Sequence, residues 1–155
     1  MNLDAIKEFL SGSETALPAV PDAGTLVEKI LPVAKILVVA GPVIMLILGL
    51  LYLFAAPREA NHHFGYRCYF GMGSEQAWRF TQRIAGVIWT TLGAVMAVAM
   101  LIVTARFAGQ DVLEMLTTAV TCVVVEALVL LAATIAIRIT IAARYDRYGE
   151  RRVRK

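Results

Sequence analysis

The chain has 155 residues, of which 59% are hydrophobic, and its formal net charge is +3 at pH 7. Soluble domains are about 45–50% apolar, so this composition excludes an ordinary soluble domain and favours a membrane protein. A chain of this length is expected to form one domain. Its two cysteines, Cys68 and Cys122, are too few for a disulfide framework, and their different depths argue against a bridge between them.

The first 30 residues are predicted to form an extracytoplasmic segment. Leu3, Ile6, Phe9 and Leu10 recur at helical spacing, which indicates a short helix on the membrane surface; a frayed terminus is the alternative. Ser11–Gly24 is rich in small residues and proline and is typical of a linker. No basic start precedes an apolar run, so we expect no signal peptide and infer that the first membrane helix directs insertion.

Three apolar blocks follow, and they define a membrane domain over residues 31–143. They are Ile36–Ala56, Ile84–Ala105 and Met115–Ile137, and Glu126 is the one charged residue in them. About 20 apolar residues in a helix span a hydrocarbon core of about 30 Å. The sequence therefore predicts an all-α integral membrane protein with three transmembrane helices.

The distribution of lysine and arginine orients these helices. The central loop Pro57–Arg83 carries four, and the basic tail of residues 144–155 carries six. On the other side, the N-terminal segment and the short loop Arg106–Glu114 carry four together, with Arg138 at the boundary. Cytoplasmic loops are enriched in basic residues, so the N-terminus is predicted outside and the central loop and tail in the cytoplasm. We expect the tail to bind the anionic inner leaflet rather than nucleic acid.

Small residues and proline shape the predicted spans. Gly41-Pro42 predicts a kink in the first helix, because proline removes a backbone hydrogen bond and crowds the preceding turn. Gly86, Gly93 and Ala97 in the second helix permit close contact with a neighbouring helix. Ser74 is predicted to be the N-cap of this helix, with Glu75 in its first turn.

Glu126 lies in the middle of the third apolar block. An acidic side chain there costs about 2.5–3.5 kcal/mol on insertion scales, so it is expected to face the inside of the bundle. Thr90 and Thr91 lie at a similar depth on the second helix and are its candidate hydrogen-bond partners. The carboxyl group either fixes helix packing or handles a proton or ligand. The first interpretation is favoured because the three blocks contain no second charge.

The central loop combines polar, aromatic and basic residues. Gly65 allows a tight turn or a close approach of the backbone. Arg67 offers a planar fork of donors for a phosphate, a carboxylate or helix-end carbonyls. Either these residues form a surface pocket for a lipid headgroup, peptide or protein, or Arg67 is a structural clasp that ties the loop to helix ends, with Tyr66 and Trp78 as interfacial anchors. The candidate binding residues are Asn61, Phe64, Gly65, Tyr66, Arg67, Trp78, Gln82 and Arg83.

Metal binding and catalysis find little support in the sequence. His62, His63 and Cys68 match no standard spacing of zinc ligands, so no metal or other cofactor is expected. The chain also contains no metalloprotease motif, nucleophile elbow or phosphate-cradling loop. We therefore predict a protein that is not an enzyme.

The order of residues in the loop resembles the SdpI family of bacterial membrane proteins. The shared pattern is Asn61-x-x-Phe64-Gly65-Tyr66-Arg67, then Ser74-x-x-x-Trp78, then Gln82-Arg83 before an apolar helix. Cys68 stands where the family usually has threonine, Gln82 where asparagine is common, and Glu59-Ala60 separates Pro57 from Asn61. The resemblance covers about Pro57–Val103, and the flanking helices by their layout.

This resemblance implies a multi-pass protein of the bacterial cytoplasmic membrane that gives immunity to a membrane-active peptide toxin. For the founding member it also implies signalling through capture of a cytoplasmic repressor. The expected partners are the bilayer and a peptide toxin or a protein. A second copy of the chain is also expected, because a bundle of three helices is too narrow to enclose a transport path. The alternative is a lipid-handling or transporter-accessory protein that uses the Arg67 loop and Glu126, and an enzyme acting on a lipid headgroup ranks third.

Overall fold

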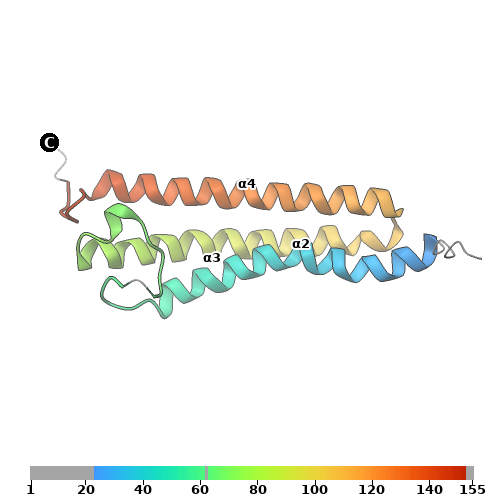
Figure 1. The fold of residues 1–155 in the computed structure, drawn as a ribbon, viewed down its shortest axis with the longest axis horizontal. Coiled ribbons are helices and arrows are strands. Elements are labelled where there is room, and N and C mark those ends of the chain that lie inside the picture. Colours follow the sequence, from blue (N-terminus) through green and yellow to red (C-terminus); the bar gives the residue numbers. More distant parts are fainter. Residues whose placement is uncertain (1–22, 62, 153–155) are drawn as a thin grey trace, which may run out of the picture.

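The computed structural model describes residues 23–61 and 63–152, and within them the fold is all-helical (Figure 1). It consists of the long helices α2 (Ala23–Phe54), α3 (Glu75–Ala105) and α4 (Val112–Arg144). Two single 3-10 turns, η1 (Tyr69–Gly71) and η2 (Phe107–Gly109), lie between them. The expected surface helix around Leu3–Leu10 and the linker up to residue 22 lie outside the described residues.

All three long helices are long and apolar enough to cross a membrane, as the sequence predicted. Many of their apolar side chains face outward, where lipid would cover them: Val95 is 68% exposed, Leu128 60% and Ile139 63%. Helix α2 already runs through residues 23–30 and continues past Pro32 and Pro42. The first membrane helix therefore starts well before the apolar block that revealed it.

The helices form an antiparallel hairpin of α2 and α3 onto which α4 folds back (Figure 1). One end of the bundle contains the end of α2, the loop of residues 55–74, the start of α3 and the end of α4. At the other end, the short connection through η2 joins α3 to α4. The loop and the C-terminal segment thus share one face of the membrane, consistent with three crossings.

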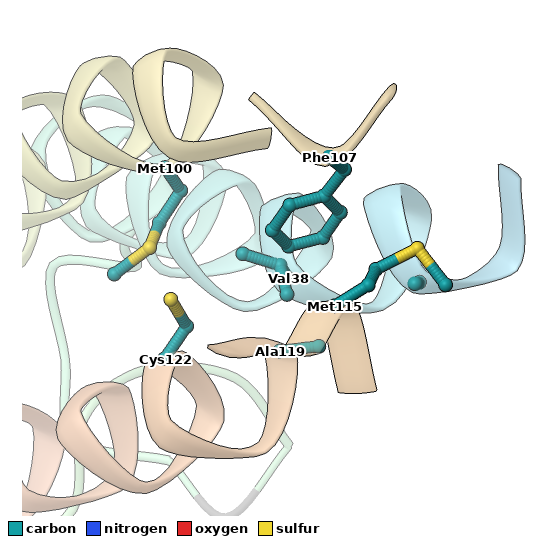
Figure 2. Packing of buried hydrophobic residues seen from close by; sticks show 7 residues of the cluster. Val38, Met100, Phe107, Met115, Ala119 and Cys122 are labelled. Carbon is teal, nitrogen blue, oxygen red and sulfur yellow. The ribbon is translucent and has the colours of Figure 1, made fainter. Parts of the chain in front are cut away.

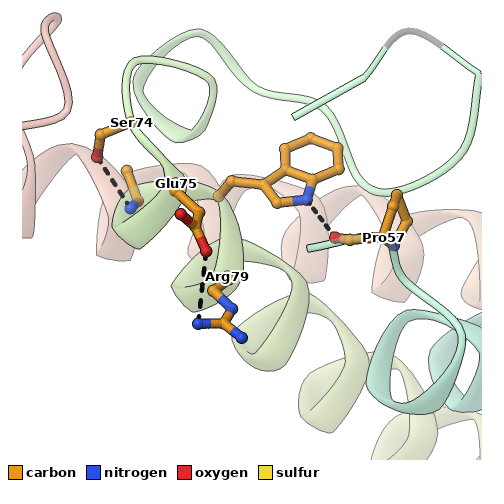
Figure 3. Close-up of polar contacts among 6 residues, drawn as sticks. Pro57, Ser74, Glu75 and Arg79 are labelled. Carbon is orange, nitrogen blue, oxygen red and sulfur yellow. Dashed lines mark hydrogen bonds and ion pairs between the residues drawn. The ribbon is translucent and has the colours of Figure 1, made fainter. Parts of the chain in front are cut away.

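Helix α3 begins at a capped N-terminus. The Ser74 hydroxyl accepts a hydrogen bond from the backbone N–H of Ala77 at 3.2 Å, which confirms the predicted N-cap (Figure 3). Glu75 follows in the first turn, where a carboxylate is favoured by the helix dipole, and lies 3.5 Å from Arg79. The cap fixes where the loop ends and the spanning helix starts.

Close packing of α2 against α3 depends on glycine. A Cβ on Gly93 would lie 2.5 Å from the backbone nitrogen of Leu46 and 3.0 Å from the carbonyl oxygen of Pro42. A Cβ on Gly86 would meet Leu53 at 2.6 Å. Gly86, Gly93 and Ala97 are all buried, which confirms the predicted close helix contact.

The end of the bundle away from the loop has an apolar core shared by all three helices. Val38, Phe107 and Met115 have no exposed surface. Figure 2 shows these side chains converging, with Met100 and Cys122 beside them. This core attaches α4 to the α2–α3 hairpin at the end opposite the loop.

We predict that Gly93→Ala lowers the free energy of unfolding by about 1–3 kcal/mol, because the new methyl group meets backbone that cannot move away cheaply. Unfolding of the purified protein in dodecyl sulfate, followed by circular dichroism, measures this loss. Gly109→Ala is the matched control, since nothing lies within 4 Å of a Cβ there. Equal stability of both variants would contradict a glycine-dependent contact.

Candidate functional site

The loop after α2 turns back toward the bundle at Asn61. The side-chain oxygen of Asn61 accepts hydrogen bonds from the backbone N–H groups of His63 at 3.0 Å and Phe64 at 2.9 Å. Such a local bond to the backbone replaces a regular turn. Gly65 follows with φ of +120°, a backbone conformation that favours glycine. Asn61 and Gly65 together direct the segment that begins at Tyr66 toward helix α3.

Tyr66 is held by the side-chain amide of Gln82. The Gln82 oxygen accepts from the backbone N–H of Tyr66 at 2.8 Å, and the Gln82 nitrogen donates to the Tyr66 carbonyl at 2.8 Å. Gln82 is only 4% exposed. The amide therefore pairs with the backbone of the loop as a neighbouring strand would, in a place with little access to water.

Trp78 forms the second attachment of the loop. Its indole Nε1 donates to the Pro57 carbonyl at 2.8 Å, and its side chain has no exposed surface (Figure 3 draws this bond). A Cβ at Gly65 would lie 2.7 Å from the Trp78 ring and 3.0 Å from the Gln82 oxygen. We call the Tyr66–Gln82 and Trp78–Pro57 hydrogen bonds the loop clasp. Glycine is required at position 65 because the backbone there passes so close to the Trp78 ring and the Gln82 oxygen.

An aromatic cluster lies beneath the loop clasp. The Tyr52 ring on α2 lies 6.1 Å from Phe64, 6.2 Å from Tyr66 and 5.5 Å from Trp89 on α3, measured between ring centroids. Tilted and edge-on pairs at these distances are favourable beyond the area they bury. The loop is therefore packed onto both helices. Trp89 was missed as part of the site because its position in an apolar block signalled only a lipid-facing helix.

Tyr66 also connects the loop to α4. Its hydroxyl donates to the Thr134 carbonyl at 3.5 Å and interacts with the Arg138 side chain. Burial raises the pKa of Tyr66, and the Arg138 guanidinium acts in the opposite direction. The sequence placed Arg138 at the membrane boundary without a role. In the structure Arg138 of α4 contacts Tyr66 of the loop.

The sequence-predicted site residues divide into two groups. Asn61, Gly65, Tyr66, Trp78 and Gln82 shape or hold the loop from inside. Arg67 and Arg83 are exposed, and Phe64 is half-buried. The residues seen to hold the loop are thus Gln82 and Trp78, whereas the clasp suggested from the sequence was Arg67, and Trp78 is enclosed rather than placed as an interfacial anchor. Arg67 is the predicted recognition residue that the structure displays outward.

Basic cavities surround the start of α3. Arg79 and Arg83 line a cavity of about 190 Å³ beside Pro57 and a second of about 520 Å³ that also contacts Arg151. The second is walled by Phe80 and Tyr145 as well. This face of the molecule is suited to anionic ligands or acidic protein surfaces.

The described part of the C-terminal segment folds back onto the loop. Tyr145 and Arg151 form an isolated antiparallel bridge, and Asp146 accepts from the backbone N–H groups of Tyr148 and Glu150, each at 2.9 Å. The hydroxyl of Ser74 donates to the Gly149 carbonyl at 2.8 Å. The tail up to residue 152 therefore packs on the start of α3. The sequence offered one signal of this turn, the glycine after Asp146-Arg147-Tyr148.

Cys68 is a half-buried free thiol at the edge of the loop, and burial raises its pKa. Cys122 is also free and lies in the apolar core. Within residues 23–61 and 63–152, no group of three or more His, Cys, Asp or Glu side chains could hold a metal ion. His62, one of the three residues considered as metal ligands, lies outside the described residues.

The Glu126 carboxyl contacts α2 rather than the threonines of α3. A Cβ on Gly41 would lie 2.5 Å from Glu126 Oε2, and the two residues line a cavity of about 210 Å³ beside Pro42. The candidate hydrogen bonds to Thr90 and Thr91 are not formed. Thr91 donates to its own helix at the Val87 carbonyl (2.8 Å), and the buried oxygens Thr90 Oγ1 and Glu126 Oε1 have no partner among the described residues. The reason is that Thr90 packs against α2 at another level, beside Gly49.

We predict that Gln82→Leu, which keeps the size of the side chain, lowers the free energy of unfolding by about 1–3 kcal/mol. The change leaves the buried N–H and C=O of Tyr66 without partners. It should also speed maleimide labelling of Cys68 as the loop loosens. The exposed Gln76→Leu is the control, with an effect within about 0.5 kcal/mol. An unchanged Cys68 labelling rate in Gln82→Leu would contradict the role of the clasp.

The loop and its supporting helices match a known family. The family model described as the SdpI/YfhL protein family matches residues 58–140, more than half of the chain, and extends beyond the loop and α3 into α4. Neither the curated proteins nor the solved structures contain a significant match. The family match and the three membrane-spanning helices confirm the expected resemblance and fold. The chain is therefore a multi-pass membrane protein that belongs to the SdpI/YfhL family.

Proposed function

We propose that this protein is a non-enzymatic membrane protein that gives immunity to, or senses, a membrane-active peptide. The observation that carries the proposal is an exposed basic and aromatic segment, Arg67 to Phe70, held on a rigid base by the loop clasp. Tyr69 is 73% exposed beside Arg67. Membership of the SdpI/YfhL family supports this function over a structural role alone.

Rigid support of the loop favours recognition over simple anchoring. Residues that only anchor a helix at the interface place their rings toward lipid. Here Trp78 and Tyr66 are buried, at 0% and 8% exposure, and their backbone and indole groups are satisfied within the protein. A preorganised loop loses little conformational entropy on binding, which raises its affinity for a partner. A relay to a cytoplasmic regulator would start from the same face, where the C-terminal turn contacts Ser74.

The proposed relay requires the loop to face the cytoplasm, as the ten-to-four count of basic residues supports. We predict that Cys68 is protected from a membrane-impermeant maleimide in intact cells and reacts after permeabilisation. Because burial raises the thiol pKa, less thiolate is present at neutral pH, so labelling is run at about pH 8.5. Mass spectrometry of the Cys68 peptide separates it from Cys122. Labelling of Cys68 in intact cells would reverse the orientation.

We predict that Arg67→Lys reduces protection of cells challenged with the cognate peptide about tenfold while membrane abundance stays normal. Lysine keeps the charge but loses the bidentate fork of the exposed guanidinium. Arg147→Lys, at an exposed arginine near the same end of the bundle that is not among the candidate binding residues, is the matched control and should protect normally. Survival is scored against protein level in the same cells.

Trp78→Phe separates recognition from architecture in the same assay. It removes the donor to the Pro57 carbonyl inside the clasp, so protection and abundance should fall together. Full protection by both variants at normal abundance would refute a functional loop. The membrane-embedded surface around Glu126 would then become the candidate.

A lipid-handling or transporter-accessory function is the second candidate. The partnerless Glu126 oxygen and the cavity beside Gly41 favour it. However, Glu126 and Arg138 are twelve residues apart on α4, or about 18 Å along the helix axis. The cavities at these two levels share no lining residue. A continuous polar path from the Arg67 loop to Glu126 therefore needs a second subunit or a partner.

A further inference from the structure

We propose that the cavity between the Arg67–Phe70 segment and α4 binds the phosphate-bearing headgroup of an anionic phospholipid. The cavity has a volume of about 490 Å³. Arg67 and Arg138 line it together with Cys68, two aromatic residues and the outer face of α4. This assignment is independent of toxin protection and concerns a different ligand.

The position of the cavity matches that of a lipid headgroup. Arg138 is the first charged residue after the apolar block Met115–Ile137, and six residues of α4 follow it. It therefore lies at the boundary between the hydrocarbon core and the headgroup region. The loop forms one wall of the cavity and α4 forms the other. The cavity therefore lies at the depth of the phosphate groups of the bilayer.

The charges of the cavity select an anion. Both arginines are exposed, and no Asp or Glu is among the residues that line it. Arg138 interacts with the Tyr66 hydroxyl, which is itself fixed by the loop clasp, so one guanidinium is held in place before a ligand arrives. Two planar guanidinium groups can share the oxygens of one phosphate.

The remaining walls select a ligand with a hydrocarbon part. Tyr69, Phe70, Ile139 and Ala142 complete the cavity, and Ile139 is 63% exposed on the lipid-facing side of α4. An acyl chain can run along this surface while the phosphate contacts the arginines. Basic pockets next to spanning helices are typical sites for anionic headgroups.

The test uses the full-length protein purified in detergent and titrated calorimetrically with three ligands. These are dioctanoyl phosphatidylglycerol, dioctanoyl phosphatidylcholine and glycerol phosphate. We expect phosphatidylglycerol to bind at least about tenfold more tightly than either of the others, because it alone combines net charge with acyl chains. Bound phosphatidylglycerol should also slow maleimide labelling of Cys68, which lines the cavity. Glycerol phosphate binding as tightly as the lipid, or no protection of Cys68, would overturn the proposal.

Variants locate the site. Arg138→Gln should weaken phosphatidylglycerol binding about tenfold, whereas Arg147→Gln, which removes the same charge at the same end of the bundle outside the cavities described above, should change it less than about twofold. Arg67→Gln is the second variant, for the case that Arg138→Gln alters helix content or melting temperature. Equal weakening by Arg147→Gln would show diffuse attraction to the basic surface and would overturn a specific site.

Discussion

The pairing of the Gln82 side chain with the backbone of Tyr66 is the interaction on which the loop depends. Gln82 lies seven residues into α3, about 10 Å from the start of the helix, where water is scarce. A loop entering this region must find partners for its N–H and C=O groups inside the protein. One amide, with a donor and an acceptor on the same planar group, satisfies both.

The pairing has consequences on both sides of the loop. Below it, the Tyr66 ring reaches Tyr52, Trp89 and α4, so one residue connects all three helices. Above it, the backbone emerges with Arg67 directed to the surface. Since α4 makes less contact with the hairpin than α2 and α3 make with each other, the bond from Tyr66 to Thr134 also helps to position α4.

Local patterns predicted most of the architecture. Three apolar blocks gave three spanning helices, Ser74 was identified as a cap, and the glycines of α3 were expected at a close contact. These features depend on residues within one helix or one turn. The contacts of Tyr66 with Thr134 and of Ser74 with Gly149 join residues 68 and 75 positions apart, which no local period reveals. Glu126 was expected near Thr90 but lies against Gly41, whereas Thr90 packs beside Gly49, eight residues along α2, because the sequence does not give the offset of two helices along the bundle.

The two ends of the bundle are built for different tasks. Away from the loop, Val38, Phe107 and Met115 form an apolar core that stabilises the bundle by packing. At the loop, polar groups are paired so that a backbone segment can sit at membrane depth, and exposed arginines surround it, among them Arg58, Arg67, Arg79, Arg83 and Arg138. Exposed cations cost little in the headgroup region and are strongly attracted to anions there. The loop end thus combines a fixed shape with a positive surface, the two properties that recognition of an anionic or membrane-bound ligand requires.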